Sequence, residues 1–129
     1  MRWHGYRVHW RGEEYEAAPD PRPDGLWMRL RAAGPVDGFE PVAPGRHVRP
    51  VPAGECEQVV FVTTACLWRG APCQVRAERE GELLVEYTGG LLPVARALGF
   101  ERVERGVHRA WVSRDEVADL HEQAVLLDL

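Results

Sequence analysis

Two histidines stand at matching places in the two halves of the chain, and each could act as a general base or as a ligand. His47 and His108 both lie at the expected start of a strand, where a histidine usually makes a structural hydrogen bond. A catalytic histidine needs a nucleophile or a carboxylate partner, and no adjacent motif supplies one. An enzyme hypothesis would therefore pair His108 with Cys73 or Glu86.

Three cysteines, Cys56, Cys66 and Cys73, raise the alternatives of a nucleophile, a metal site or structural thiols. Their number is odd and no Cys-x-x-Cys pair occurs, which is unlike a zinc site or a disulfide framework. A nucleophilic thiol needs a lowered pKa, whereas Cys66 and Cys73 align with Val8 and Tyr15 of the first half, which suggests core packing. We expect three reduced structural thiols, no metal and no cofactor.

The stretch 86–90, Glu-Tyr-Thr-Gly-Gly, is the sharpest local pattern. Two glycines at a strand end allow a tight turn or a close backbone approach, and Pro93 begins a helix soon after. A strand, a glycine pair and a helix start can together hold an anion. The phosphate-binding pattern Gly-x-x-x-x-Gly-Lys is missing and the chain has no lysine, so a structural turn is the favoured interpretation.

The composition excludes several classes of protein. The chain has 129 residues, of which 45% are hydrophobic and 28% charged, as expected for one globular domain. No apolar run approaches the ~20 residues of a membrane span, and the N-terminus lacks the apolar segment of a signal peptide. A net charge of −4 argues against a nucleic-acid partner, which would require a basic surface. We therefore expect a cytoplasmic protein that binds no membrane.

The elements that must position these residues come in two copies. Aligning residues 10–18 with 68–76, 24–34 with 80–90, and 38–59 with 99–120 gives thirteen identities in forty-two positions, where composition alone gives roughly three. The identities include the strings Trp-Arg-Gly and Gly-Phe-Glu and several further glycines. We predict a single domain, residues 1–129, built of two repeats, 5–58 and 63–120.

Each repeat predicts four strands followed by a turn or a helix. Apolar and polar residues alternate in strands at 6–10, 14–18, 26–31 and 47–51, and again at 60–68, 73–77, 82–87 and 108–112. The first repeat ends in a short turn, whereas residues 113–116 of the second fit a capping box that would open a C-terminal helix with Val117, Leu120 and Ala124 on one face. The second repeat also gains a short helix over 92–98, with Pro93 at its start and Gly99 at its end.

These elements predict an α+β, strand-rich fold. The architecture is an internal duplication of a β-β-β-β-(α) unit, with a C-terminal helix. Small bent sheets of this kind resemble SH3-like barrels. Function does not follow from that analogy.

Residues that break the symmetry of the repeats are freer to serve a partner than residues that both copies share. Trp10 and Trp68 match and are expected in a core shared by the two halves, whereas Trp3 and Trp27 match no tryptophan and suit either an interface or core filling. The second repeat alone has the 92–98 insertion, the 86–90 string and an acidic segment at 115–122. The predicted partner-binding residues are Glu86, Tyr87, Arg96, Glu101 and Trp27, and no catalytic residue is predicted.

A resemblance adds to this interpretation. The strings Thr64-x-Cys66-x-Trp68-Arg69-Gly70, Glu86-Tyr87-Thr88-Gly89-Gly90 and Leu98-Gly99 resemble those of a group of small actinobacterial proteins of uncertain role. In its size, its acidity and its lack of a catalytic motif, the chain also resembles immunity proteins that neutralise polymorphic toxins. This resemblance implies a toxin domain as partner, and it carries over no functional residues.

The leading hypothesis is a non-enzymatic, immunity- or antitoxin-like inhibitor that blocks a partner protein by occlusion. An acidic surface with aromatic anchors would dock on the partner, and the chain would be a monomer or part of a heterodimer. One alternative is an SH3-like module that binds a peptide or a nucleic acid through exposed aromatic residues. The other is the small enzyme based on His108.

Overall fold

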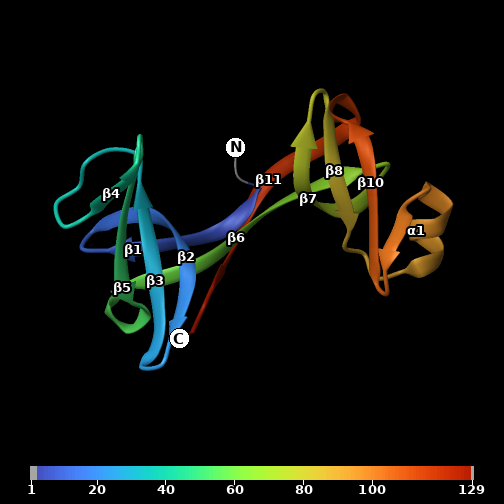
Figure 1. Ribbon diagram of the computed structural model, residues 1–129. Coiled ribbons are helices and arrows are strands. Elements are labelled where there is room, and N and C mark those ends of the chain that lie inside the picture. The colour runs from blue at the N-terminus through green and yellow to red at the C-terminus, as the bar shows by residue number, and fades with distance from the viewer. Residues whose placement is uncertain (1–2, 129) are drawn as a thin grey trace. The chain divides into compact units, whose positions relative to one another are not determined.

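The computed structural model describes residues 3–128 (Figure 1). These residues form an open antiparallel sheet of eleven strands and one α-helix. The chain divides into two compact units. The N-terminal unit comprises residues 5–62 and the end of the chain from Ala124, and the C-terminal unit comprises residues 63–123 and the first described residues, 3 and 4. Within the described part of the chain, no helix has the length and apolarity needed to cross a membrane.

The N-terminal unit is a set of antiparallel strands around its own core. The strands pair in the order β4-β5-β3-β2-β1, followed by the first part of β6, and a 3-10 turn (Ala53–Glu55) follows β5. Alternate side chains point to the core; those buried include Val8, Trp10, Met28, Leu30 and Val51. The strands of this unit are β1 (His4–Trp10), β2 (Glu13–Arg22), β3 (Gly25–Ala32), β4 (Glu40–Ala43) and β5 (Arg46–Pro52).

The C-terminal unit repeats this order and adds the helix. Here the second part of β6 (Gln58–Trp68) leads into the order β6-β7-β8-β10-β9, and β11 pairs with β6. The core includes Trp3, Trp68, Val85, Phe100 and Val112. The elements are β7 (Ala71–Arg79), β8 (Glu82–Tyr87), α1 (Leu92–Leu98), β9 (Glu101–Glu104), β10 (Val107–Ser113), a 3-10 turn (Arg114–Glu116) and β11 (Val117–Leu126).

Both Trp-Arg-Gly strings form tight hairpin turns, as their sequence predicts. Arg11 and Gly12 have φ of 51° and 79°, and Arg69 and Gly70 have φ of 50° and 77°. Two successive residues with positive φ define the turn whose twist matches the twist of the strands on either side. The preceding tryptophans, Trp10 and Trp68, are buried as expected, but each lies in the core of its own unit rather than in a shared core.

The helix predicted over 92–98 is confirmed as α1. Proline stands in its first turn, and Gly99 ends it with φ of 86°. The backbone N–H of Gly99 donates to the Arg96 carbonyl and that of Phe100 to the Ala95 carbonyl, so the last turn is closed. The Ala95 side chain is fully buried, which fixes α1 against the core of the C-terminal unit.

The predicted C-terminal helix is wrong. Ser113 makes no side-chain capping hydrogen bond, the 3-10 turn is three residues long, and the chain continues as β11, paired with β6. Glu116 does not cap the turn: its Oε2 accepts a hydrogen bond of 3.1 Å from Trp68 Nε1. Asp119 has φ of 54°, which a helix interior does not allow. Pairing with a distant strand therefore overrides the local helical pattern.

Trp3 belongs to the core rather than to an interface. Its side chain is 5% exposed and packs in the same cluster as Trp68. The interface alternative for this tryptophan is therefore wrong, and core filling is correct.

Candidate binding pocket in the C-terminal unit

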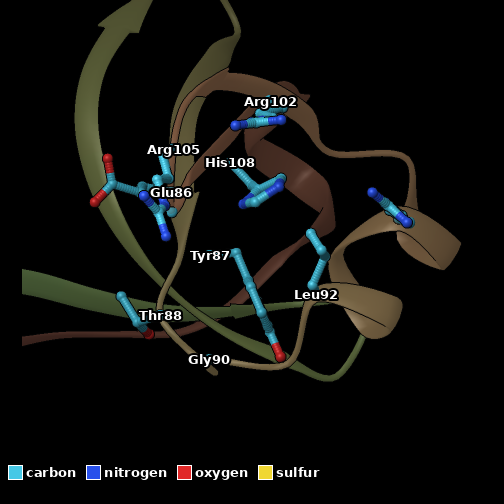
Figure 2. A pocket seen from close by; sticks show the side chains of 10 residues that line it. Glu86, Tyr87, Thr88, Gly90, Leu92, Arg102, Arg105 and His108 are labelled. Carbon is cyan, nitrogen blue, oxygen red and sulfur yellow. The ribbon is translucent and has the colours of Figure 1, made fainter.

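A pocket of about 650 Å³ opens where β8 ends, beside α1 and the turn between β9 and β10 (Figure 2). This volume lies in the usual range for small-molecule sites. Figure 2 shows the side chains of Tyr87, Leu92, Arg102 and His108 around one space. The lining combines an aromatic ring and an apolar side chain with several cationic groups.

Strand pairing places His108 and Arg102 side by side. They are Cα partners in the antiparallel pair β9–β10, so their side chains lie on the same face. The β8–β10 register pairs Arg109 with Glu86. Extending this register by one residue places Tyr87 beside His108. A row of three side chains, Tyr87, His108 and Arg102, therefore crosses the end of the sheet where the pocket lies.

His108 is the most enclosed polar group of the pocket. Its side chain is 8% exposed, and within residues 3–128 its ring has no hydrogen-bond partner. Its ring nitrogens are not among the fully buried polar atoms that lack a partner, so they reach the space of the pocket. The ring lines the pocket, so a group inside the pocket is the partner that this geometry can accept.

Three arginines bring positive charge to the pocket from three different elements. Arg96 lies in α1, Arg102 in β9 and Arg105 in the turn that follows β9. No carboxylate among the described residues pairs with any of them. Other arginines of this unit do pair: Arg76 and Arg109 bind Glu86, Arg79 binds Glu82, and Arg114 binds Glu78. The pocket is thus a cationic site in a protein of net charge −4.

Glu86 does not act on His108. Arg76 Nη2 and Arg109 Nε donate to its two oxygens over 2.9 and 2.8 Å. Burial raises the pKa of Glu86, but these two guanidinium groups outweigh that effect and hold it below the usual carboxyl range. Strand alternation puts Glu86 and Arg109 on the face opposite His108, and in Figure 2 the carboxylate points away from the ring. Glu86 therefore closes a structural ion-pair cluster at the pocket's edge.

Cys73 does not reach His108 either. It pairs with Tyr87 in the β7–β8 register, so β8 separates it from β10 by two strand spacings, roughly 9–10 Å. Its side chain is 1% exposed, and burial, with a smaller contribution from Cys66, raises its pKa to about 12. Such a thiol is not a nucleophile at neutral pH. The structure brings neither predicted catalytic partner to His108.

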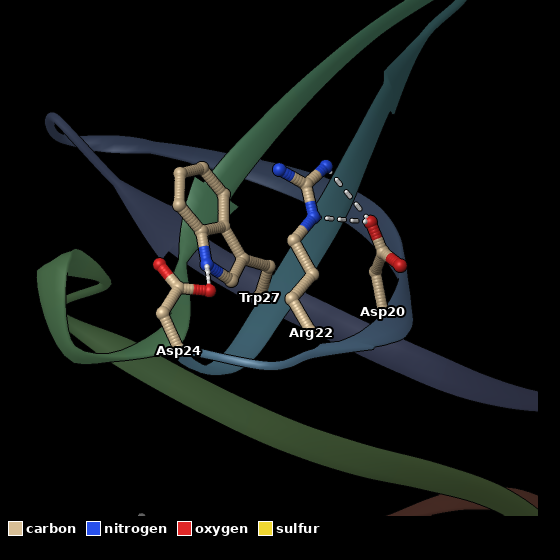
Figure 3. Close-up of polar contacts among 4 residues, drawn as sticks. All are labelled: Asp20, Arg22, Asp24 and Trp27. Atoms are coloured by element: carbon tan, nitrogen blue, oxygen red, sulfur yellow. Dashed lines mark hydrogen bonds and ion pairs between the residues drawn. The ribbon is translucent and has the colours of Figure 1, made fainter.

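The other two predicted site residues lie away from the pocket. Glu101 is exposed on β9 and pairs with Arg109, on the face opposite His108. Trp27 belongs to the N-terminal unit, in the β2–β3 hairpin (Figure 3). Its Nε1 donates to Asp24 Oδ1 over 3.2 Å, and the Arg22 guanidinium lies 4.3 Å from its ring centroid. Of the five predicted residues, Glu86, Tyr87 and Arg96 line the pocket.

Sequence reasoning missed Arg102 and Arg105, and it considered His108 as a base or a ligand without including it among the predicted partner-binding residues. No local motif marks these residues. The β9–β10 hairpin that brings them together was not predicted either. The aligned repeats do contain a signal: Pro41 occupies the position of Arg102, and Pro44 occupies the position of Arg105.

The described residues form a small strand-rich protein with a cationic pocket in its C-terminal unit. The chain belongs to the family described as "Uncharacterised conserved protein UCP033725", whose model matches residues 5–127. No curated protein and no solved structure matches the chain significantly. Within the described residues, no group of three or more His, Cys, Asp or Glu side chains is arranged to hold a metal ion.

Proposed function

We propose that this protein is a non-enzymatic binding protein that docks on a partner protein through its C-terminal unit and inhibits the partner by occlusion. The observation that carries the proposal is the surface around the pocket. Arg96, Arg102 and Arg105 have no acidic partner among residues 3–128, and the start of α1 exposes the apolar side chains of Leu91 (61%) and Leu92 (41%). Arginine and apolar anchors side by side are typical of protein interfaces.

The charge of this surface sets the chemistry of the partner. An acidic docking surface was expected from the net charge, but the pocket concentrates cationic side chains. Complementary charge steers association and selects partners. The partner would therefore present acidic side chains to the pocket and an apolar patch to α1. An immunity- or antitoxin-like role, with a toxin domain as partner and a cytoplasmic location, is the form of this hypothesis that the sequence suggests.

The alternatives receive less support from the geometry. An enzyme based on His108 would need Cys73 or Glu86 beside it, and both lie elsewhere. A nucleic-acid-binding groove stacks successive bases on several aromatic rings, whereas this pocket offers one, Tyr87. An SH3-like peptide module has the same difficulty, and the strands form an open sheet.

We also propose that the two units, residues 5–58 and 63–120, arose by internal duplication. The strand orders β4-β5-β3-β2-β1 and β9-β10-β8-β7-β6 correspond element by element. The same backbone conformations recur at aligned residues: φ is 84° at Gly38 and 86° at Gly99, and 69° at Gly45 and 77° at Gly106. Val8 pairs with Tyr15 as Cys66 pairs with Cys73. These matches at aligned positions support a common origin.

The docking proposal is tested by affinity capture with the full chain as bait, in cells that express it naturally. The test variant is Tyr87→Ala/Arg96→Ala, and the matched control is Arg46→Ala, an exposed arginine of the N-terminal unit. A central anchor contributes at least about 2 kcal/mol, which is about 30-fold in Kd. Wild type and control should retain the same partner and the double variant should lose it. Equal retention by all three baits would contradict the proposal.

A further inference from the structure

The starting observation is a largely enclosed histidine whose ring nitrogens reach into a cationic pocket. His108 is 92% enclosed and lines the pocket with a ring that has no hydrogen-bond partner among residues 3–128. A neutral imidazole has one N–H donor, and a protonated one has two. The natural partner for a donor surrounded by arginines is an anionic oxygen.

The arginines converge on the same space although nothing inside the described part of the protein neutralises them. Arg96, Arg102 and Arg105 come from a helix, a strand and a turn, and each lines the pocket. Like charges brought together repel one another, and the repulsion grows as water is displaced. A bound anion would remove this cost and pair the three guanidinium groups at once.

The scaffold does not need these arginines. In the N-terminal unit, His47 pairs with Pro41 at the place where His108 pairs with Arg102. Arg105 begins the turn between β9 and β10, and Pro44 begins the turn between β4 and β5. The glycine that follows has positive φ in both turns. The same hairpin therefore forms with proline at both positions, so the arginines are explained by a ligand better than by folding.

The number and kind of donors indicate which anion fits. One carboxylate is satisfied by one or two guanidinium groups, because it has two oxygens on one plane. Three arginines, an imidazole and the hydroxyl of Thr88, which also lines the pocket, match a group with three terminal oxygens and a charge near −2. The remaining volume, bounded by Tyr87 and Leu92, would hold an organic body.

We propose that this pocket binds a small phosphate monoester. The Arg96, Arg102, Arg105 and His108 side chains hold the phosphate, and Tyr87 and Leu92 contact the organic part. The proposal goes beyond protein docking, because the isolated chain binds the ester whether or not a partner protein exists. The ester and the acidic side chains of a docked partner would compete for the same three arginines.

The test is isothermal titration of the full chain with phenyl phosphate, compared with inorganic phosphate and with phthalate, an aromatic dianion with two carboxylates. Wild type should bind phenyl phosphate at least about tenfold more tightly than either comparison ligand, and added salt should weaken the binding. Phthalate binding as tightly as phenyl phosphate would overturn the proposal. A phosphotyrosine peptide binding more than about tenfold more tightly than phenyl phosphate would assign the phosphate to a partner protein instead and would also overturn it.

Variants locate the site. Arg102→Ala and His108→Gln should each weaken phenyl phosphate binding by about tenfold or more, whereas Arg46→Ala should leave it unchanged. Thermal unfolding of every variant separates lost binding from lost folding. If His108→Gln does not fold, Arg102→Ala still decides the matter, because Arg102 is exposed and forms no ion pair with any other described residue. Equal affinities of Arg102→Ala and wild type would refute the assignment.

Discussion

Glu86 offers the clearest distinction between a residue that binds a partner and one that holds the sheet together. Its carboxylate, with the side chain 15% exposed, receives one hydrogen bond from Arg76 and one from Arg109. These contacts join β7, β8 and β10 on the face opposite the pocket row. We predict that Glu86→Gln lowers the free energy of unfolding.

The size of the loss follows from the contacts. Hydrogen bonds to charged groups contribute about 1.5–3 kcal/mol each, but the two arginine side chains are 28% and 35% exposed, so water screens them. The glutamine oxygen also keeps one acceptor. We therefore expect a loss of about 2 kcal/mol at pH 7. Glu82→Gln is the matched control, because Glu82 binds one arginine, Arg79, and is 37% exposed; its loss should stay below about 1 kcal/mol.

The loss must also depend on pH with a definite sign. The pKa of Glu86 is lowered in the folded protein, so its contribution is complete above the ordinary carboxyl value of 4.5 and disappears as pH falls through the folded-state pKa. Urea unfolding at pH 7 and at pH 3 should therefore show a smaller difference between wild type and Glu86→Gln at the lower pH. A difference that is the same at both pH values, or no larger than that of Glu82→Gln, would refute this account of the cluster.

Two further predictions concern the core and the thiols. Trp68→Ala should lower the free energy of unfolding by about 3–5 kcal/mol, because Trp68 is 4% exposed and packs edge-on against Phe100, with 5.1 Å between the ring centroids. Trp111 is 37% exposed, so Trp111→Ala should cost about 1 kcal/mol in the same urea experiment. Equal losses would contradict the core assignment. Titration of unfolded, unreduced protein should find three free thiols, and a single free thiol would contradict this. Burial raises the pKa of all three thiols, so exposure decides their order in the folded protein: iodoacetamide should modify half-buried Cys56 before the buried Cys66 and Cys73.

Local patterns predicted the elements whose signals are local. The Trp-Arg-Gly turns need positive φ at two successive residues, and α1 is bounded by Pro93 and Gly99. The short strands β4 and β9 were missed because all their residues are exposed, so no apolar alternation marks them. The strand β11 was mistaken for a helix because Val117, Leu120 and Ala124 fit helical spacing, whereas its pairing with β6 is a contact over a long sequence separation.

The pocket could be predicted only in part for the same reason. Tyr87 and Arg96 were chosen because they break the symmetry of the repeats, and both line the pocket. Arg102 and Arg105 join them only once the β9–β10 hairpin is known, since the pairing of Arg102 with His108 depends on register. Glu86 also lines the pocket, but its two arginine partners come from β7 and β10, so its structural ion pairs could not be read from its own strand.

The central claim is that binding belongs to the C-terminal unit, and hydrogen exchange measured by mass spectrometry tests it most directly. The chain would be compared alone and in complex with the partner retained by the wild-type bait. The account predicts slower amide exchange in residues 86–108, which contain the pocket and α1, and unchanged exchange in residues 20–31 around Trp27. Protection confined to residues 20–31, with 86–108 unchanged, would contradict it.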